Sequence, residues 1–308
     1  MRSYRRLAWR RDRELTGFLR DVAHRHAQVN VFNPSFARAG EALIVAYRAI
    51  PEGEGTIRAY AATIARPGEA AAVADLSAWG AEHGIAKVAD PKVLRRGDAV
   101  YVTFNTGFVP KGEFNDIYLM QVFPRLGEPQ RVVADFARQS VEKNWAFLTS
   151  TDRVSAVYRL HPYAEVVCSR GELGGCGDLV FALRTPARAD SEAGEGLSIG
   201  TQLLADGGEH RLIAHEKVYD DAGKRSYYGR AVSIAGVGTD RVVVRAAPQR
   251  LIHTRRDAQP REGVHNPNLL SATYFSGLAR RGSRIVLGYG INDVAAGIAR
   301  VRGASLWP

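Results

Sequence analysis

Several polar and charged side chains, placed near short apolar segments, are of the types that bind anions or transfer protons. They are Asn33, Asp90, Lys143, Arg159, His215 and Asp293. A positioned carboxyl group can give or take a proton during a reaction. Lys and Arg bind phosphate and carboxylate groups through charge-assisted hydrogen bonds. These residues form one site only if the fold brings them together; otherwise each of them ends a strand at the solvent edge.

Most of these residues belong to a pattern that repeats along the chain. In each repeat a polar residue near Pro or Gly precedes an apolar strand, a charged turn and a second strand with a polar end. The five repeats are Asn33–Arg48, Asp90–Asn105, Lys143–Arg159, Ile199–Glu216 and Asn266–Gly290. Their starts are 57, 53, 56 and 67 residues apart. Four antiparallel strands with turns fill such a length, so the spacing predicts five propeller blades. The alternative, a β-sandwich, would predict irregular spacing.

The elements between the repeats are also short and β-rich. The clearest strands are expected at Ala42–Tyr47, Ala99–Phe104, Val154–Tyr158, Arg211–His215, Arg241–Arg245 and Arg284–Tyr289. Helical periodicity is weak except at 70–79 and near the N-terminus, where Leu15, Phe18, Leu19 and Val22 share one helix face. We therefore predict an all-β fold, a five-bladed β-propeller with an N-terminal helix. Residues 1–28 form the basic amphipathic helical segment and residues 29–308 the catalytic propeller.

The composition is that of an ordinary folded protein. Of 308 residues, 45% are hydrophobic and 24% are charged, which excludes intrinsic disorder. No apolar run reaches the roughly 20 residues of a membrane span, and no secretory signal opens the chain. With only Cys168 and Cys176, a cytoplasmic protein is expected, although one disulfide between these two residues stays open.

The basic charge is concentrated at the N-terminus. Half of the net charge of +10 comes from residues 1–26, which hold eight arginines and three acidic residues. Because no nucleic-acid motif accompanies this charge, we expect no nucleic-acid partner. A helix that is basic on one face and apolar on another is instead expected to be solvated or to contact a second copy of the chain.

The motifs taken together resemble glycoside hydrolase family 130, the five-bladed β-mannoside phosphorylases and hydrolases, and the related β-1,2-mannosyltransferases of glycosyltransferase family 108. The resemblance spans roughly residues 30–303. Residues 89–92, Ala-Asp-Pro-Lys, are similar to the family's E-D-P-R motif, with Ala89 in place of its first acid. The other similar segments are Phe32–Pro34 with Tyr47–Arg48, Glu142–Leu148, Tyr158–Leu160, Gly200–Gln202 and Tyr289–Ala299. The family's prolines are missing at Thr149 and Gln202.

The resemblance implies that Asp90 is the general acid of an inverting reaction. Such an acid is expected to have a raised pKa, although Ala89 removes one neighbouring charge that would raise it. The resemblance further implies that the sugar is bound by Asn33, Arg48, Asn105, Tyr289 and Asp293. Tyr289 and Trp145 either stack on sugar rings or belong to the core. No metal is expected, with a calcium ion on the axis as a minor alternative.

The group that attacks the sugar decides the reaction class. A phosphorylase must bind inorganic phosphate, and the resemblance assigns this to Lys143, Arg159 and His215, with a hydroxyl from Tyr228 or Tyr227. A hydrolase would use a carboxylate to activate water, and Glu142 and Glu216 are the candidates. We therefore expect a β-mannoside phosphorylase that releases mannose 1-phosphate, with phosphate as co-substrate and no other cofactor. A hydrolase, a mannosyltransferase and a non-catalytic glycan-binding propeller stay open as alternatives.

Overall fold

The computed structural model describes residues 3–66, 69–107, 110, 113–139, 141–148, 153–256 and 269–308. Strands dominate these residues, as predicted. Thr149 and the opening of the fifth repeat, residues 266–268, lie outside the described residues. No helix in the described part of the chain is long and apolar enough to cross a membrane.

Within these residues the strands pair in five consecutive antiparallel groups. The first two groups are β2 (Gln28–Ala39), β3 (Ala42–Pro51), β4 (Arg58–Ile64) and β5 (Ala72–Asp75), then β6 (Ala89–Arg96), β7 (Ala99–Asn105), β8 (Ile117–Phe123) and β9 (Gln130–Ala134). The third group is β10 (Ala146–Leu148), β11 (Ser155–Leu160), β12 (Tyr163–Arg170) and β13 (Leu179–Arg184). The fourth is β15 (Leu197–Ile199), β16 (Leu204–Asp206), β17 (Glu209–Tyr219), β18 (Arg225–Ala235) and β19 (Arg241–Ile252). The fifth is β20 (Leu269–Arg281), β21 (Arg284–Ile291) and β22 (Ala295–Arg302).

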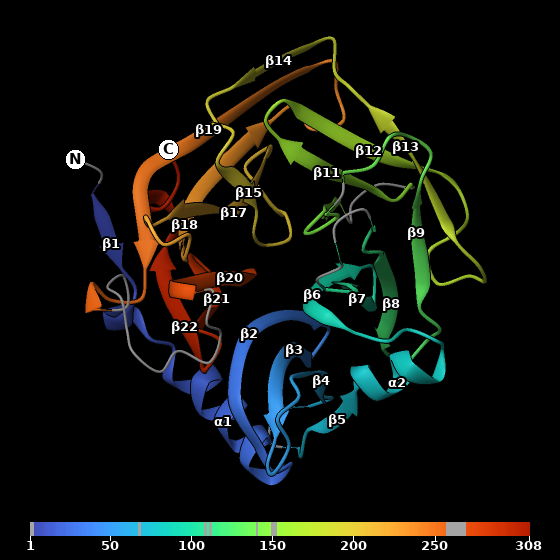
Figure 1. The fold of residues 1–308 in the computed structure, drawn as a ribbon, viewed down its shortest axis with the longest axis vertical. Coiled ribbons are helices and arrows are strands. Elements are labelled where there is room, and N and C mark those ends of the chain that lie inside the picture. The colour runs from blue at the N-terminus through green and yellow to red at the C-terminus, as the bar shows by residue number, and fades with distance from the viewer. Residues whose placement is uncertain are drawn as a thin grey trace.

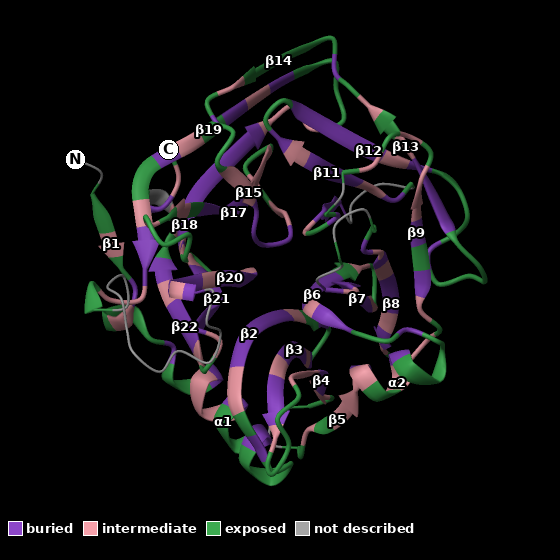
Figure 2. Cartoon of the chain, in the orientation of Figure 1, coloured by how far each residue is buried: buried purple, intermediate pink, exposed green. Residues whose placement is uncertain are grey.

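The groups surround a common centre instead of stacking as two sheets (Figure 1). Parallel pairs join neighbouring groups, β13 with β9 and β18 with β20. Strand β2 contacts β20, β21 and β22, so the first group adjoins the last. Buried residues follow the strands, whereas exposed residues cover the outer loops (Figure 2). This arrangement gives every group an inner edge near the centre.

The N-terminal segment packs onto the ring. Helix α1 (Arg13–Arg25) begins at Asp12, whose side chain accepts a hydrogen bond from the Leu15 amide. Its apolar face, including Leu15 and Leu19, is buried in a cluster with residues of β2, β3, β21 and β22. Strand β1 (Tyr4–Arg6) pairs with the end of β19, and β14 (Arg188–Ser191) pairs with its beginning. The apolar stripe that would suit a second copy thus contacts the chain's own sheets.

The remaining elements are short. Helix α2 (Leu76–Glu82) follows β5, so residues 70–79, where weak helical periodicity stood out, hold a strand and only the start of a helix. Turns of 3-10 helix occur at Ala8–Arg10 and Gly303–Ser305. The two cysteines are free thiols, Cys168 buried and Cys176 exposed, with no disulfide between them.

Candidate active site

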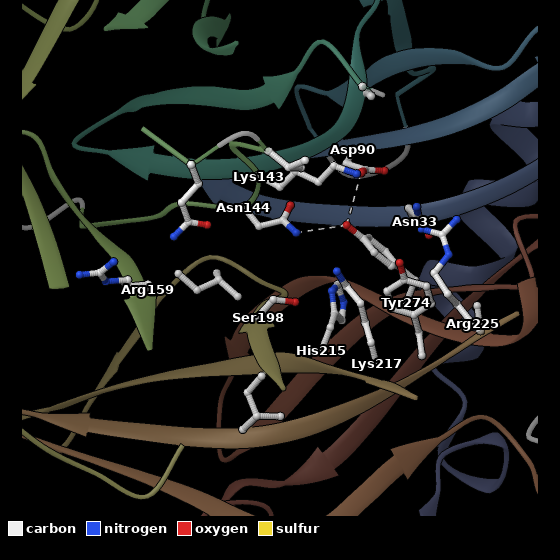
Figure 3. A pocket seen from close by; sticks show the side chains of 18 of the residues that line it. Asn33, Asp90, Lys143, Asn144, Arg159, Ser198, His215, Lys217, Arg225 and Tyr274 are labelled. Carbon is white, nitrogen blue, oxygen red and sulfur yellow. Dashed lines mark hydrogen bonds between the residues drawn. The ribbon is translucent and has the colours of Figure 1, made fainter. Parts of the chain in front are cut away.

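A cavity of about 760 Å³ lies where the five groups converge, because its walls include residues from each of them. Of the residues expected to act on substrate, those that line it are Asn33, Arg48, Asp90, Lys143, Arg159, His215 and Asp293. Figure 3 shows most of these side chains gathered around one space, with Arg159 on the opposite side from Asp90 and Asn33. The fold therefore brings these residues, which stand at recurring positions of the sequence repeats, together around one cavity.

Three residues expected at the site, Asn105, Tyr289 and Tyr228, do not line this cavity, although Asn105 lines a small separate pocket together with Asp90. Asn105 is buried at the end of β7, where its side-chain oxygen accepts the Gly107 amide at 2.9 Å. The Tyr289 ring packs against Phe275, and its hydroxyl lies 3.0 Å from Nδ1 of His253. Tyr289 is thus a core residue, as the alternative interpretation had it. Trp145 is also 2% exposed and sits in an aromatic cluster of the core.

The third is Tyr228, where the strand decides between two neighbouring tyrosines. Side chains alternate between the two sides of a strand, so Tyr227 and Tyr228 of β18 point in opposite directions. Tyr227 lines the cavity. Tyr228 packs against Tyr4 and lies under the guanidinium of Arg250, at 4.6 Å from its ring centre. The hydroxyl available to a ligand is therefore that of Tyr227, which corrects the choice of Tyr228.

Asp90 is held at the cavity wall by an unusual backbone. Its φ is 51°, in the left-handed region, and Asn33 and Asn144 share this conformation with φ values of 52° and 60°. Asp and Asn tolerate this region better than other residues with a Cβ. Asp90 and Asn33 both precede proline, where an extended conformation is normally favoured. The same strained step thus occurs within β2, at Asn33, and at the second residue of β6, Asp90, and both side chains line the cavity.

The charge state of Asp90 differs from the expectation for a general acid. Burial by itself would raise the pKa of Asp90, but Arg48, Lys143 and Lys92 outweigh it and hold the pKa below the usual value. Nη1 of Arg48 lies 3.0 Å from Oδ1 of Asp90, and the Tyr274 hydroxyl donates to Oδ2 at 3.3 Å. Asp90 is therefore a carboxylate at neutral pH in this structure, and the raised pKa is not found.

Positive charge dominates the cavity wall. The lining cations are Arg48, Lys87, Lys143, Arg159, Lys217 and Arg225, against the acids Asp90, Glu195 and Asp293. Burial, Lys143 and Arg225 all lower the pKa of Lys217, which shows that these cations are close enough to repel one another. Among the described residues, two donors, Nε of Arg48 and Nε of Arg159, are buried without a hydrogen-bond partner, as is one acceptor, Oδ1 of Asn33, which would suit a hydroxyl group of a ligand. The wall is therefore suited to an anion with several acceptor oxygens.

His215 lines the cavity as an uncharged group. Burial and the nearby Lys92 lower its pKa to about 3. Its Nε2 lies 2.9 Å from the backbone of Phe275, and its ring stacks on Tyr274 with 4.0 Å between the ring centres. His215 can therefore give a ligand at most a neutral hydrogen bond.

Both carboxylates considered for water activation have other partners. Glu142 accepts hydrogen bonds from Trp145, Tyr158 and the Gln139 amide, at 2.9, 2.9 and 3.0 Å. Burial would raise the pKa of Glu216, but the guanidinium groups of Arg250 and Arg230 lower it to about 2. Neither residue lines the cavity among the described residues. In the described chain, no three metal-binding side chains gather either.

Sequence reasoning missed several residues of the wall. Lys217 is two residues beyond His215 on β17, and Arg225 begins β18, so strand alternation next to a predicted site residue could have found Lys217. Lys92, Asn144 and Tyr274 form contacts behind Asp90 that no spacing in the sequence indicates. Tyr274 comes to Asp90 from the fifth strand group, 184 residues along the chain.

Comparison with solved structures shows the same fold in carbohydrate-active enzymes. A β-1,2-mannobiose phosphorylase from Listeria innocua is 11% identical, with a TM-score of 0.54 over 91% of each chain. A mannose phosphorylase from Leishmania mexicana in complex with phosphate is 14% identical, with a TM-score of 0.53 over 90% of this chain and 84% of that one. A GDP-Man-dependent mannosyltransferase from Leishmania mexicana is 12% identical, with a TM-score of 0.56 over 91% of this chain and 86% of that one.

The resemblance to glycoside hydrolase family 130 and to the related mannosyltransferases is thus confirmed at the level of the fold, over about 90% of the chain. No protein-family model matches the sequence, and no curated protein matches it significantly.

Proposed function

We propose that this protein is an inverting β-mannoside phosphorylase that releases mannose 1-phosphate, with Asp90 as its general acid. One observation carries the proposal: a cavity in which the carboxylate of Asp90 is held by Arg48 and Tyr274 is lined by six Lys and Arg side chains. A neutral sugar does not require such a wall, whereas a phosphate co-substrate does. The two carboxylates that would activate water in a hydrolase are engaged elsewhere.

The fold gives the proposal its frame. We assign the five antiparallel groups to the five blades of a propeller, with the cavity on the propeller axis. Inner strands of all blades end near the axis, so residues far apart in sequence share one site. The likeness to solved mannoside phosphorylases supports this assignment and the choice of mannose.

In the proposed reaction, a phosphate oxygen forms a bond with the anomeric carbon while the bond to the leaving sugar oxygen breaks. Asp90 supplies the proton that the leaving oxygen takes up. Lys143, Arg159 and Lys217 bind the phosphate, with the Tyr227 hydroxyl and His215 as neutral donors. Asn33, Arg48 and Asp293 bind the sugar hydroxyls.

The charge state of Asp90 bears on the direction of the reaction. As a carboxylate it is ready to take a proton from an acceptor sugar, which is the synthetic direction. Phosphorolysis requires a protonated Asp90. A bound phosphate next to Lys143 would offset the cations that hold the pKa of Asp90 down, so the co-substrate itself favours protonation.

A second candidate function is transfer of mannose from a phosphorylated donor to a sugar. The cations on β17 and β18 favour it, because Lys217 and Arg225 add positive charge to the wall next to Lys143. The fold shared with a GDP-Man-dependent mannosyltransferase supports this alternative.

Product analysis tests the proposal. The purified protein is incubated with β-1,2-mannobiose with and without inorganic phosphate, and the products are separated and identified. Mannose 1-phosphate that forms only with phosphate is the expected result. Free mannose in both reactions would overturn it in favour of a hydrolase. A product that forms only when a nucleotide-activated or phosphorylated mannose donor is supplied would favour the transferase.

A further inference from the structure

A chain of hydrogen bonds runs from a buried lysine to the carboxylate of Asp90. Nζ of Lys92 donates to Oδ1 of Asn144. Nδ2 of Asn144 donates to the Tyr274 hydroxyl at 3.3 Å, and this hydroxyl donates to Oδ2 of Asp90 at 3.3 Å. Figure 3 shows the last two links. The four residues come from β6, from the segment before β10 and from β20, and they meet only through the fold.

Every donor in this chain points toward Asp90. Below its pKa of about 7, Lys92 is an ammonium group, and this group and the carboxylate at the other end polarise the bonds between them in the same sense. Such bonds strengthen one another. The amide of Asn144 does not pass a proton on, so the chain fixes and polarises the carboxylate and does not conduct protons. Lys92 is 1% exposed, which places its charge in the interior behind Asp90.

We propose that Lys92, Asn144 and Tyr274 are positioning residues that orient Asp90 through its Oδ2 and stabilise its carboxylate form. Arg48 holds Oδ1 from the other side, so the carboxyl group is fixed at both oxygens. Asp90 and Asn144 both have a left-handed backbone conformation, and the hydrogen bonds through Tyr274 link these two strained residues. The catalytic meaning of this assignment rests on the proposed role of Asp90, but the contact network does not.

The ionisation of Lys92 and Tyr274 agrees with this role. Burial lowers the pKa of Lys92 to about 7, although the attraction of Asp90 opposes the change. Burial and the nearby Asp90 raise the pKa of Tyr274 well above its usual value, so its hydroxyl keeps its proton and stays a donor. Removing either group would make the carboxylate form of Asp90 less favourable.

The test is a ¹³C NMR titration of the Asp90 carboxyl carbon in protein labelled at aspartate, with the signal assigned by its loss in Asp90→Asn. Tyr274→Phe keeps the ring against His215 and removes only the hydroxyl. Tyr163→Phe is the matched control, because the Tyr163 hydroxyl also donates to a buried carboxylate, Glu165, at 2.8 Å, away from the cavity. Lys92→Met removes the charge with a side chain of similar volume.

We expect the Asp90 titration midpoint to rise by about one pH unit in Tyr274→Phe and in Lys92→Met, as the loss of a hydrogen bond to a charged group implies. Tyr163→Phe should leave it unchanged. A midpoint in Tyr274→Phe equal to that of the wild type would overturn the proposal, even if Lys92→Met does not fold.

Activity separates this inference from the proposed function. In the synthetic direction, Tyr274→Phe should lower kcat about tenfold and shift the acidic limb of the pH profile upward, while KM for the acceptor changes little. A shifted NMR midpoint in a protein without phosphorylase activity would leave the positioning role intact and refute the proposed function instead. An unshifted midpoint in an active phosphorylase would do the reverse.

Discussion

Arg48 and Asp90 form an ion pair between neighbouring strand groups, with Nη1 of Arg48 3.0 Å from Oδ1 of Asp90. Arg48 lies on β3 and Asp90 at the start of β6, 42 residues along the chain. Nε of Arg48 is buried and has no hydrogen-bond partner among the described residues, and Arg48 also lines the cavity. The pair therefore links the proposed acid to a group that would bind the sugar, and the two should respond to substrate together.

Replacing Asp90 by asparagine should abolish turnover while preserving binding. Loss of a general acid typically lowers the rate about 10²- to 10⁴-fold, and the amide keeps the size and one acceptor of the carboxylate. We expect this loss in kcat for phosphorolysis, measured by the release of mannose 1-phosphate. The affinity for phosphate, measured by calorimetry, should fall little or should even increase.

The control for this variant is Asp116→Asn, which breaks an ion pair with Arg138 outside the cavity. It should retain wild-type turnover. If Asp90→Asn is as active as this control, Asp90 is not the acid.

Variants of the neighbouring residues Tyr227 and Tyr228 should differ in their effect on phosphate binding. Tyr227→Phe removes a hydroxyl at the cavity wall and should raise KM for phosphate about three- to tenfold, as the loss of one hydrogen bond implies. Tyr228→Phe alters the contact with Tyr4 and Arg250 and should leave KM for phosphate unchanged. Steady-state kinetics at varied phosphate measure both. The opposite pattern would place the phosphate on the other side of β18.

Lys217 should contribute to anion binding through its charge. Lys217→Met removes one cation next to Lys143 and Arg225, and we expect KM for phosphate to rise about tenfold, with a weaker dependence on ionic strength. Lys224, exposed in the turn of the same hairpin, gives the control Lys224→Met, which should change neither. Equal effects of the two variants would mean that the overall charge of the hairpin matters and not a contact.

Glu216 should prove structural and not catalytic. Its carboxylate pairs with Arg230 and Arg250 at 3.0 and 2.8 Å and is 8% exposed. Breaking a buried pair costs about 3 kcal/mol, so Glu216→Gln should lower the free energy of unfolding by about this amount at pH 7. Kinetics should change little where the variant is folded.

The pH dependence of the stability contributed by Glu216 follows from the direction in which its pKa changes. Because the folded pKa of Glu216 is lowered from 4.5 to about 2, its contribution to stability is present above 4.5 and is lost as the pH falls toward 2. Denaturant unfolding at pH 7 and at pH 3 should show the difference between variant and wild type shrink at the lower pH. A folded Glu216→Gln protein that has lost turnover would revive Glu216 as a catalytic base.

The sequence by itself determined the β-rich architecture and much of the cavity wall. The repeat spacing and the polar residue at one phase of each repeat predicted that Asn33, Asp90, Lys143 and Arg159 would converge, and they line one cavity. This was predictable because a repeated unit places equivalent residues at equivalent points around a common centre. The apolar stripe of α1 was readable for the same reason, since helical period fixes which residues share a face.

Only the tertiary structure decided which neighbour of a residue faces the cavity and what surrounds it. A shift of one residue along a strand reverses the side, so Tyr227 and Tyr228 could not be told apart without the register of β18. The partners of Asp90 come from other groups, Arg48 from the first and Tyr274 from the fifth. Its charge state depends on these distant cations, because electrostatic interactions follow distance in space and not separation along the chain.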